Sequence, residues 1–157
     1  MTIENKKHIT FGDDSFIHFT IPGQPMGKQR ARTRTVNTKA GKSFVMSYTP
    51  KKTLNYETYI KELFVIKYPG FIIMENAISV DVMAYLIIPK SKSKKQKEAM
   101  LNGDIFPTTR PDGDNILKVC LDALQGICFK TDSQIIRGSF KKIYSDQPRI
   151  EIVIGEI

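Results

Sequence analysis

Alternation of apolar and polar side chains predicts β-strands towards both ends of the chain. The predicted strands cover residues 15–21, 77–88, 133–143 and 149–154. In the first strand, Ile17, Phe19 and Ile21 share one side, so this side is expected to face the core. The Pro22-Gly23 pair then ends the strand, because proline and glycine favour turns.

Apolar residues at helical spacing predict a helix after Pro50. Its expected buried stripe recurs at i, i+3, i+7 and i+10: Tyr56, Tyr59, Leu63 and Ile66. The Pro69-Gly70 pair ends this pattern, since proline cannot continue a helix. A shorter and very polar helix is predicted over residues 94–101.

The clearest helical pattern covers residues 114–124. Asp114 is expected to be the N-cap, and Gly126 lies just past the expected end. The apolar residues of this segment are expected to lie in the core: Ile116, Leu117, Cys120, Leu121 and Leu124. Strands and helices in this order predict a single α+β domain over residues 1–157, with helices packed on a mixed or mainly antiparallel sheet.

The segment between residues 23 and 50 has no clear periodicity and is strongly basic. No acidic residue lies between Asp14 and Glu57, whereas cations are frequent there: Lys28, Arg30, Arg32, Arg34, Lys39, Lys42, Lys51 and Lys52. We expect a functional or partly mobile loop that contacts phosphate, with a possible strand over residues 43–48.

The whole chain is basic as well, with a net charge of +8 and a pI of about 9.5. Five lysines lie between Lys90 and Lys97, and these either contact phosphate or form a solvated face. No apolar run reaches the ~18 residues that a membrane span requires, so no membrane association and a cytoplasmic location are expected.

Several classes of site are not indicated. The two cysteines, Cys120 and Cys128, have no CxxC spacing and are expected to be reduced, partly buried thiols without zinc. No P-loop or GxGxxG motif is present, so no nucleotide cofactor is expected.

The candidate chemistry lies in three aspartates around the predicted helix start. Asp112 and Asp114 flank Gly113, and Asp132 follows after a turn that is expected to return it to the other two. Three converging carboxylates bind a cation or take up protons, because they repel one another. Oxygen-only ligands favour Mg²⁺, with Mn²⁺ as a possible substitute, and such a metal supports hydrolysis of a phosphodiester.

Lys118 and Asp122 share one helix face with Asp114, at i+4 and i+8. Lys118 is therefore a candidate to stabilise the negative charge that develops during cleavage. Structural explanations remain open for each residue. Asp112 and Asp114 also suit a turn and an N-cap, Lys118 also suits a surface ion pair with Asp114, and Asp132 also suits a turn.

The segments RPDGDNILKVCLDALQG and TDSQI resemble the signature PDxDNxxKxxxDAL…DDxQ of the RusA family of Holliday junction resolvases. The N-terminal IPGQPMGKQRARTR is similar to that family's proline-rich, basic opening. The resemblance implies catalytic roles for Asp112, Asp114, Asp132 and Lys118. It differs at Thr131, where the family has an acid, and it leaves the role of Asp122 open.

The resemblance also implies an activity. It implies Mg²⁺-dependent, paired nicking of four-way DNA junctions in recombination and repair by a homodimer, often encoded by a prophage. Lys28, Arg30, Arg32 and Arg34 are then expected to hold the DNA backbones beside the metal site. Two alternatives are a catalytically silent, basic DNA-binding module of phage origin, and a different nuclease that acts on RNA or flaps.

Overall fold

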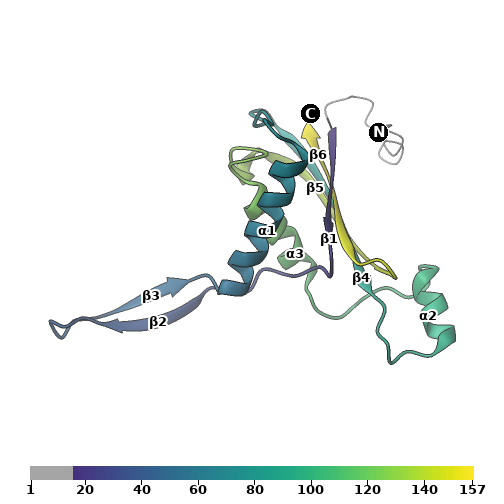
Figure 1. Cartoon of the computed structure of the whole chain (residues 1–157), viewed down its shortest axis with the longest axis horizontal. Coiled ribbons are helices and arrows are strands. Elements are labelled where there is room, and N and C mark those ends of the chain that lie inside the picture. Colours follow the sequence, from purple (N-terminus) through teal and green to yellow (C-terminus); the bar gives the residue numbers. More distant parts are fainter. Residues whose placement is uncertain (1–15) are drawn as a thin grey trace.

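A four-stranded mixed sheet forms the centre of the computed structural model, which describes residues 16–157 (Figure 1). The strand order is β1-β6-β4-β5, with β1 over Phe16–Pro22, β6 over Arg149–Glu156, β4 over Ile78–Ile87 and β5 over Ile135–Ser145. Only the β4–β5 pair is parallel; β1–β6 and β4–β6 are antiparallel. The predicted α+β class and mixed sheet are confirmed, although residues 1–15 of the predicted domain lie outside the described residues.

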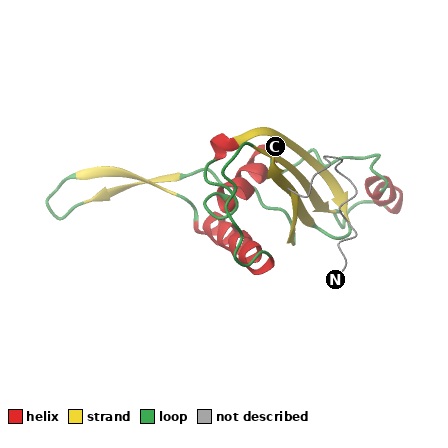
Figure 2. Cartoon of the chain, turned by 90° about the horizontal axis from the view of Figure 1, so that it is seen from above, coloured by secondary structure: helices red, strands yellow, loops and turns green. Residues whose placement is uncertain are grey.

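Two helices pack against one face of this sheet: α1 over Lys51–Lys67 and α3 over Gly113–Leu124 (Figure 2). The alternation predicted for the first strand is confirmed, because Phe19 and Ile21 are buried against these helices and Ile17 packs beside them. Full burial of such a side chain stabilises the fold by about 1.5–3 kcal/mol. The core therefore joins the sheet to both helices.

The buried stripe of α1 differs from the prediction. The residues that face the core are Thr53, Tyr56, Ile60 and Phe64. Ile66 is 76% exposed, and Tyr59 lies at the edge, where its hydroxyl donates to the carbonyl of Pro22 at 3.2 Å. The prediction was wrong for these two residues, because aromatic and β-branched side chains occur on both sides of this helix.

The basic segment forms a two-stranded antiparallel hairpin, with β2 over Arg32–Asn37 and β3 over Ser43–Tyr48. This hairpin, which we call the arm, extends away from the body of the protein (Figures 1 and 2). The possible strand over residues 43–48 is confirmed, whereas the prediction missed the strand over residues 32–37. Strand β2 has no core beneath it among the described residues, and its sequence lacks the apolar alternation of a half-buried strand.

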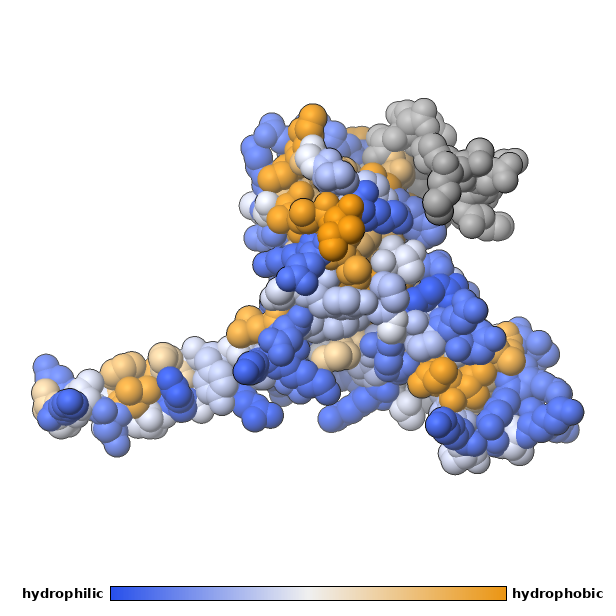
Figure 3. All heavy atoms as spheres, viewed as in Figure 1, coloured by the Kyte–Doolittle hydropathy of each residue, from blue (hydrophilic) through white to orange (hydrophobic). Residues whose placement is uncertain are grey.

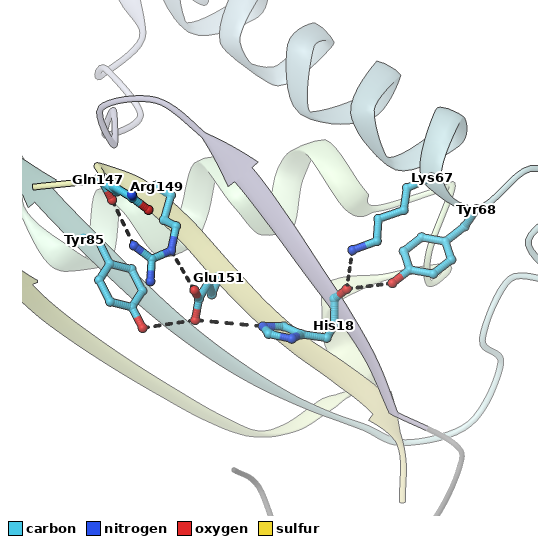
Figure 4. Close-up of polar contacts among 7 residues, drawn as sticks. All are labelled: His18, Lys67, Tyr68, Tyr85, Gln147, Arg149 and Glu151. Atoms are coloured by element: carbon cyan, nitrogen blue, oxygen red, sulfur yellow. Dashed lines mark hydrogen bonds and ion pairs between the residues drawn. The ribbon is translucent and has the colours of Figure 1, made fainter. Parts of the chain in front are cut away.

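The sheet face that points away from α1 and α3 carries a polar network (Figure 4). Glu151 accepts hydrogen bonds from Tyr85 at 3.0 Å and from Arg149 at 2.7 Å, and His18 lies 3.9 Å away. The guanidinium of Arg149 also lies over the ring of Tyr85, 3.6 Å from its centroid. These contacts tie β1, β4 and β6 together on their open side.

The lysine-rich segment forms α2 over Lys94–Leu101. Its N-terminus is capped by Ser93, which forms a capping box with Gln96. Helix α2 lies beside the loop that leads to α3 and apart from α1 (Figure 1). Within residues 16–157, no helix is both long and apolar enough to cross a membrane.

Candidate functional site

The site is built around the N-terminus of α3. Asp112 is the N-cap and Asp114 lies in the first turn, so the prediction that Asp114 caps the helix was wrong by two residues. The buried side of α3 consists of Ile116, Val119, Cys120, Ala123 and Leu124. This amphipathic pattern turns Asp114 and Lys118 towards solvent, as predicted, and leaves Asp122 half-buried.

Tight packing fixes the position of the helix start. A Cβ added at Gly113 would lie only 2.2 Å from the ring of Phe140 on β5, so no other residue fits without movement. The ammonium group of Lys142, also on β5, donates to the carbonyls of Thr109 at 2.9 Å and Pro111 at 3.1 Å. The peptide bond that leads into Pro111 is cis. Strand β5 therefore holds the backbone on both sides of Asp112.

The charged side chains at the helix start have no structural partner. Among residues 16–157, Asp112, Asp114 and Lys118 make no side-chain hydrogen bond or ion pair, and Asp112 makes no capping bond to the helix. The N-cap bond and the Asp114–Lys118 pair, which were the structural alternatives, are therefore not formed.

Asp132 opens a short 3₁₀ helix, η1, over Asp132–Gln134, directly before β5. Gln134 fixes this turn, because its Oε1 accepts from the backbone of Lys130 at 2.7 Å and of Thr131 at 2.9 Å. Its Nε2 donates to the carbonyl of Met74 at 3.0 Å. Within the described chain, Asp132 itself is exposed and has no side-chain partner.

This anchoring places Asp132 at the far end of α3 from Asp112. Helix α3 has 12 residues, which corresponds to a length of about 18 Å. Beside it, β5 runs from Ile135, next to Asp132, to Phe140, which contacts Gly113. Within residues 16–157, no three Asp, Glu, His or Cys side chains of one chain lie close enough to hold a metal ion. The expected return of Asp132 to Asp112 and Asp114 was therefore wrong for a single chain.

Asp112 and Asp114 suit a divalent cation as a pair. Their carboxylates are exposed, have no other partner among the described residues, and supply the oxygen ligands that Mg²⁺ prefers. The pair leaves most coordination positions to water or to substrate phosphate, which is typical of Mg²⁺ sites.

Lys28 was expected to contact phosphate, but its side chain is paired with carboxylates of the protein itself. Its ammonium group is bonded to the carboxylate of Asp122 on α3 and lies 3.2 Å from that of Glu57 on α1. Burial on its own lowers the pKa of Lys28, but the hydrogen bonds and charges of Asp122 and Glu57 outweigh burial and raise that pKa above its usual value. Lys28 thus links α1 to α3. The role of Asp122, which the sequence left open, is to pair with Lys28.

The same segment places the base of the arm beside the site. The backbone N–H of Lys28 donates to the carbonyl of Asn115 in the first turn of α3, at 2.8 Å. One residue before it, a Cβ on Gly27 would lie 3.1 Å from the Cβ of Asn115. Arg30, at the base of the arm, is exposed. Arg32 and Arg34 are exposed on β2, so these three cations remain available for DNA.

Sequence reasoning missed three residues that shape the site. Lys142 and Glu57 act through contacts that depend on the tertiary fold, and no local pattern marks them. Gln134 did have a signal, since it corresponds to the glutamine of the DDxQ pattern, three residues after Thr131. Its hydrogen bonds indicate that this glutamine orders the turn that carries Asp132.

The two cysteines are free, as predicted, and they are fully rather than partly buried. Burial raises the pKa of the Cys120 and Cys128 thiols to about 12. Both are therefore protonated at neutral pH, which excludes them as nucleophiles under these conditions.

Comparison with known proteins supports the resemblance seen in the motifs. A family model described as "Endodeoxyribonuclease RusA" matches residues 22–155. A protein of Bacillus subtilis (strain 168), named "Uncharacterized protein YqaN", is 36% identical over 143 residues. The matched region covers 90% of this chain and 96% of that protein.

Proposed function

The chain belongs to the RusA family of endodeoxyribonucleases, and we propose that it resolves four-way DNA junctions by paired nicking. The observation that carries the proposal is the group of unpartnered charges, Asp112, Asp114 and Lys118, at a helix start beside the arm. Paired nicks in such junctions would place the protein in DNA recombination and repair. Its gene, on this proposal, is of prophage origin.

Nucleases of this family are metal-dependent in general, and Mg²⁺ is the proposed ion here. Asp112 and Asp114 are the proposed ligands, together with Asp132. When bound between them and a DNA phosphate, the ion would supply charge stabilisation and an activated water. Lys118, one helical turn from Asp114, would stabilise negative charge on the phosphate as the bond breaks. Lys142 and the close packing at Gly113 hold the backbone of Asp112 while this occurs.

A homodimer is part of the proposal because one chain does not bring its three aspartates together. In a two-fold dimer with antiparallel α3 helices, the start of one α3 lies near the end of the other. Asp132 of the partner subunit would then complete the site of Asp112 and Asp114. Two such sites related by two-fold symmetry also match the two symmetry-related strands of a junction.

The exposed cations of the arm are the proposed DNA contacts. Arg30, Arg32 and Arg34 extend outwards from a point fixed to α3, so a DNA backbone held by them passes near Asp112 and Asp114. Each lost phosphate contact lowers the slope of log affinity against log salt by about 0.9 on duplex DNA. An Arg30→Ala, Arg32→Ala double variant should show a slope lowered by nearly two units, and an unchanged slope would refute these contacts.

One panel of substrates tests the activity itself. Purified protein is incubated with a four-way junction, a linear duplex, a flap and an RNA hairpin, each with Mg²⁺ or with EDTA. Symmetrical paired nicks in the junction, dependent on Mg²⁺, are the expected result. Binding without cleavage under any divalent metal would instead support a silent DNA-binding module, and cleavage of RNA or flaps alone would support a different nuclease.

A further inference from the structure

One face of the arm combines apolar and cationic side chains, and no other element of residues 16–157 packs on it. Cross-strand pairs place the following residues on this face: Arg32, Arg34, Val36, Phe44, Met46 and Tyr48. We call this set the arm face. Phe44 is 50% exposed and Tyr48 is 42% exposed. In Figure 3 the hydrophobic side chains of the arm appear as orange spheres between blue ones.

The opposite face of the arm is different in character. It carries small polar side chains and one apolar residue, Val45, which is 69% exposed. The hairpin is therefore asymmetric, with both of its aromatic rings on the arm face. Exposed apolar groups rimmed by polar residues commonly mark a site of interaction.

Hydrogen bonds fix the base of the arm to the body of the protein and close its tip. At the base, the backbone N–H of Gln29 donates to the buried hydroxyl of Thr53 at 3.2 Å. At the tip, Thr38 and Lys42 exchange hydrogen bonds between 2.8 and 3.1 Å, and Gly41 has a φ of +76° that favours glycine. Six residues per strand give an arm of about 20 Å. Such an isolated hairpin is marginally stable in water, so a partner that covers the arm face also stabilises it.

Charge identifies the class of that partner. The arm carries Arg32, Arg34, Lys39 and Lys42 and no acidic residue, and the whole chain has a net charge of +8. A second copy of the chain would bring like charge towards these cations, whereas nucleic acid brings phosphates of opposite charge. The guanidinium of Arg34 lies 6.0 Å from the centroid of the Tyr48 ring, so cation and aromatic ring share one contact surface.

Aromatic rings that stack on nucleic acid need accessible base faces, whereas phosphate contacts do not. In a linear duplex the base faces are covered by stacking, so Phe44 and Tyr48 cannot reach them. At a branch point, stacking is interrupted and base faces become available to aromatic side chains. We infer that the arm face is a base-contacting site in which Phe44 and Tyr48 stack on exposed bases at the centre of a branched DNA.

This inference rests on the proposed function, because it takes branched DNA as the ligand, and it adds a source of selectivity. The cations of the arm hold phosphate in any DNA, while the aromatic rings gain contacts only where stacking is broken. Phe44 and Tyr48 thus determine the preference for branched over linear DNA. Each stacked base typically raises affinity by about ten-fold or more.

Binding assays in EDTA test the inference without any cleavage. The Phe44→Ala, Tyr48→Ala double variant is expected to lose about ten-fold or more in affinity for a four-way junction. Its affinity for linear duplex and its salt slope should stay unchanged, because the arginines remain. Val45→Ala, on the opposite face of the same strand, is the matched control and should bind both DNAs as the wild type does.

If the Phe44→Ala, Tyr48→Ala double variant disturbs the hairpin, a fluorescent variant provides a second test of base contact. The chain has no tryptophan, so Phe44→Trp introduces a single indole on the arm face. Its fluorescence should be quenched by the four-way junction and much less by linear duplex, whereas Val45→Trp should show no such difference. The fluorescence of a 2-aminopurine base at the branch point should also change on binding, because this base would then stack on the arm face.

Three outcomes would overturn the inference. They are unchanged junction affinity in the double variant, equal quenching of both tryptophan variants, and a dimer that dissociates in the double variant when free of DNA. The last result would show that a second copy covers the arm face. Failure of the proposed function is distinct, because a wild type that prefers branched DNA and never cuts it would refute the nuclease and still support the arm face.

Discussion

The ammonium group of Lys28 is bonded to the carboxylate of Asp122, across 94 positions of sequence. The contact joins the base of the arm to the last turn of α3, and the nearby carboxylate of Glu57 extends it to α1. The arm and the helix that carries Asp114 are therefore held in one arrangement. If the arm holds DNA as proposed, this arrangement would keep that DNA close to the proposed metal ligands.

Loss of this bridge should cost stability. Lys28→Met leaves Asp122 and Glu57 partly buried without a cation, and the expected loss is about 1 kcal/mol in the free energy of unfolding at neutral pH. Urea unfolding followed by circular dichroism measures it. The matched control is Glu75→Gln, which breaks the exposed pair with Lys130 and should change stability by less than about 0.5 kcal/mol.

The same variant should show a defined pH dependence. The pKa of Lys28 is raised in the folded protein, so its contribution is complete below the usual lysine pKa of 10.5 and is lost as pH rises through the higher folded-state pKa. The stability difference between wild type and Lys28→Met should therefore be constant at neutral pH and shrink above 10.5. A difference that grows with alkaline pH would contradict this account.

Gly113→Ala should damage both stability and cleavage. The added Cβ would meet the Phe140 ring at 2.2 Å, and overpacking of this kind typically costs about 1–3 kcal/mol. The helix start must shift, which displaces Asp112 and Asp114. Thermal unfolding and nicking rate measure the two effects. Gly138→Ala on β5 is the control, since its Cβ would meet only the Val80 carbonyl at 3.7 Å.

The sequence predicted α3 and its solvent-facing residues correctly because the helix has one apolar side. Ile116, Cys120 and Leu124 are fully buried, while Asp114 and Lys118 are exposed. Strand β2 of the arm was missed because both of its faces lie outside the core, so its sequence has no period-two apolar pattern. Hydrophobic patterns reveal elements that pack, and the arm packs on nothing within the described chain.

The expected approach of Asp132 to Asp112 and Asp114 within one chain was wrong for a different reason. Local sequence shows a turn after α3, but the direction of the chain after it depends on where Gln134 is anchored. Gln134 donates to the carbonyls of Met74 and Asn76, which lie before β4 and far away in the sequence. These contacts keep Asp132 at the end of α3, and no pattern within residues 110–135 indicates them.

The two cysteine thiols should not react with thiol reagents in the folded protein. Because burial raises the pKa of Cys120 and Cys128 to about 12, neither thiol is ionised at pH 8 and neither is accessible to reagent. Titration with Ellman's reagent at that pH should detect no thiol in native protein and both thiols in denaturant. Rapid reaction of either cysteine in native protein would contradict their burial.

Mixing two inactive variants tests whether the site is shared between subunits. Asp112→Asn and Asp132→Asn are each expected to lose cleavage as separate proteins. If Asp132 acts across the dimer, a mixed dimer contains one intact site and one doubly altered site, so mixing after subunit exchange should restore nicking of one strand. Mixtures that stay inactive although mixed dimers have formed would show that no site is shared between subunits.

The most direct test of the central claim compares three aspartates of the same segment. Asp112→Asn and Asp114→Asn should bind the four-way junction and nick it at least about a hundred-fold more slowly in Mg²⁺, because a metal ligand is lost. Asp122→Asn removes a carboxylate from the same face of α3 but keeps an oxygen that can accept the hydrogen bond from Lys28, so it should nick within a few-fold of the wild-type rate. If Asp112→Asn and Asp114→Asn nick the junction as fast as Asp122→Asn, the metal site is not at the start of α3.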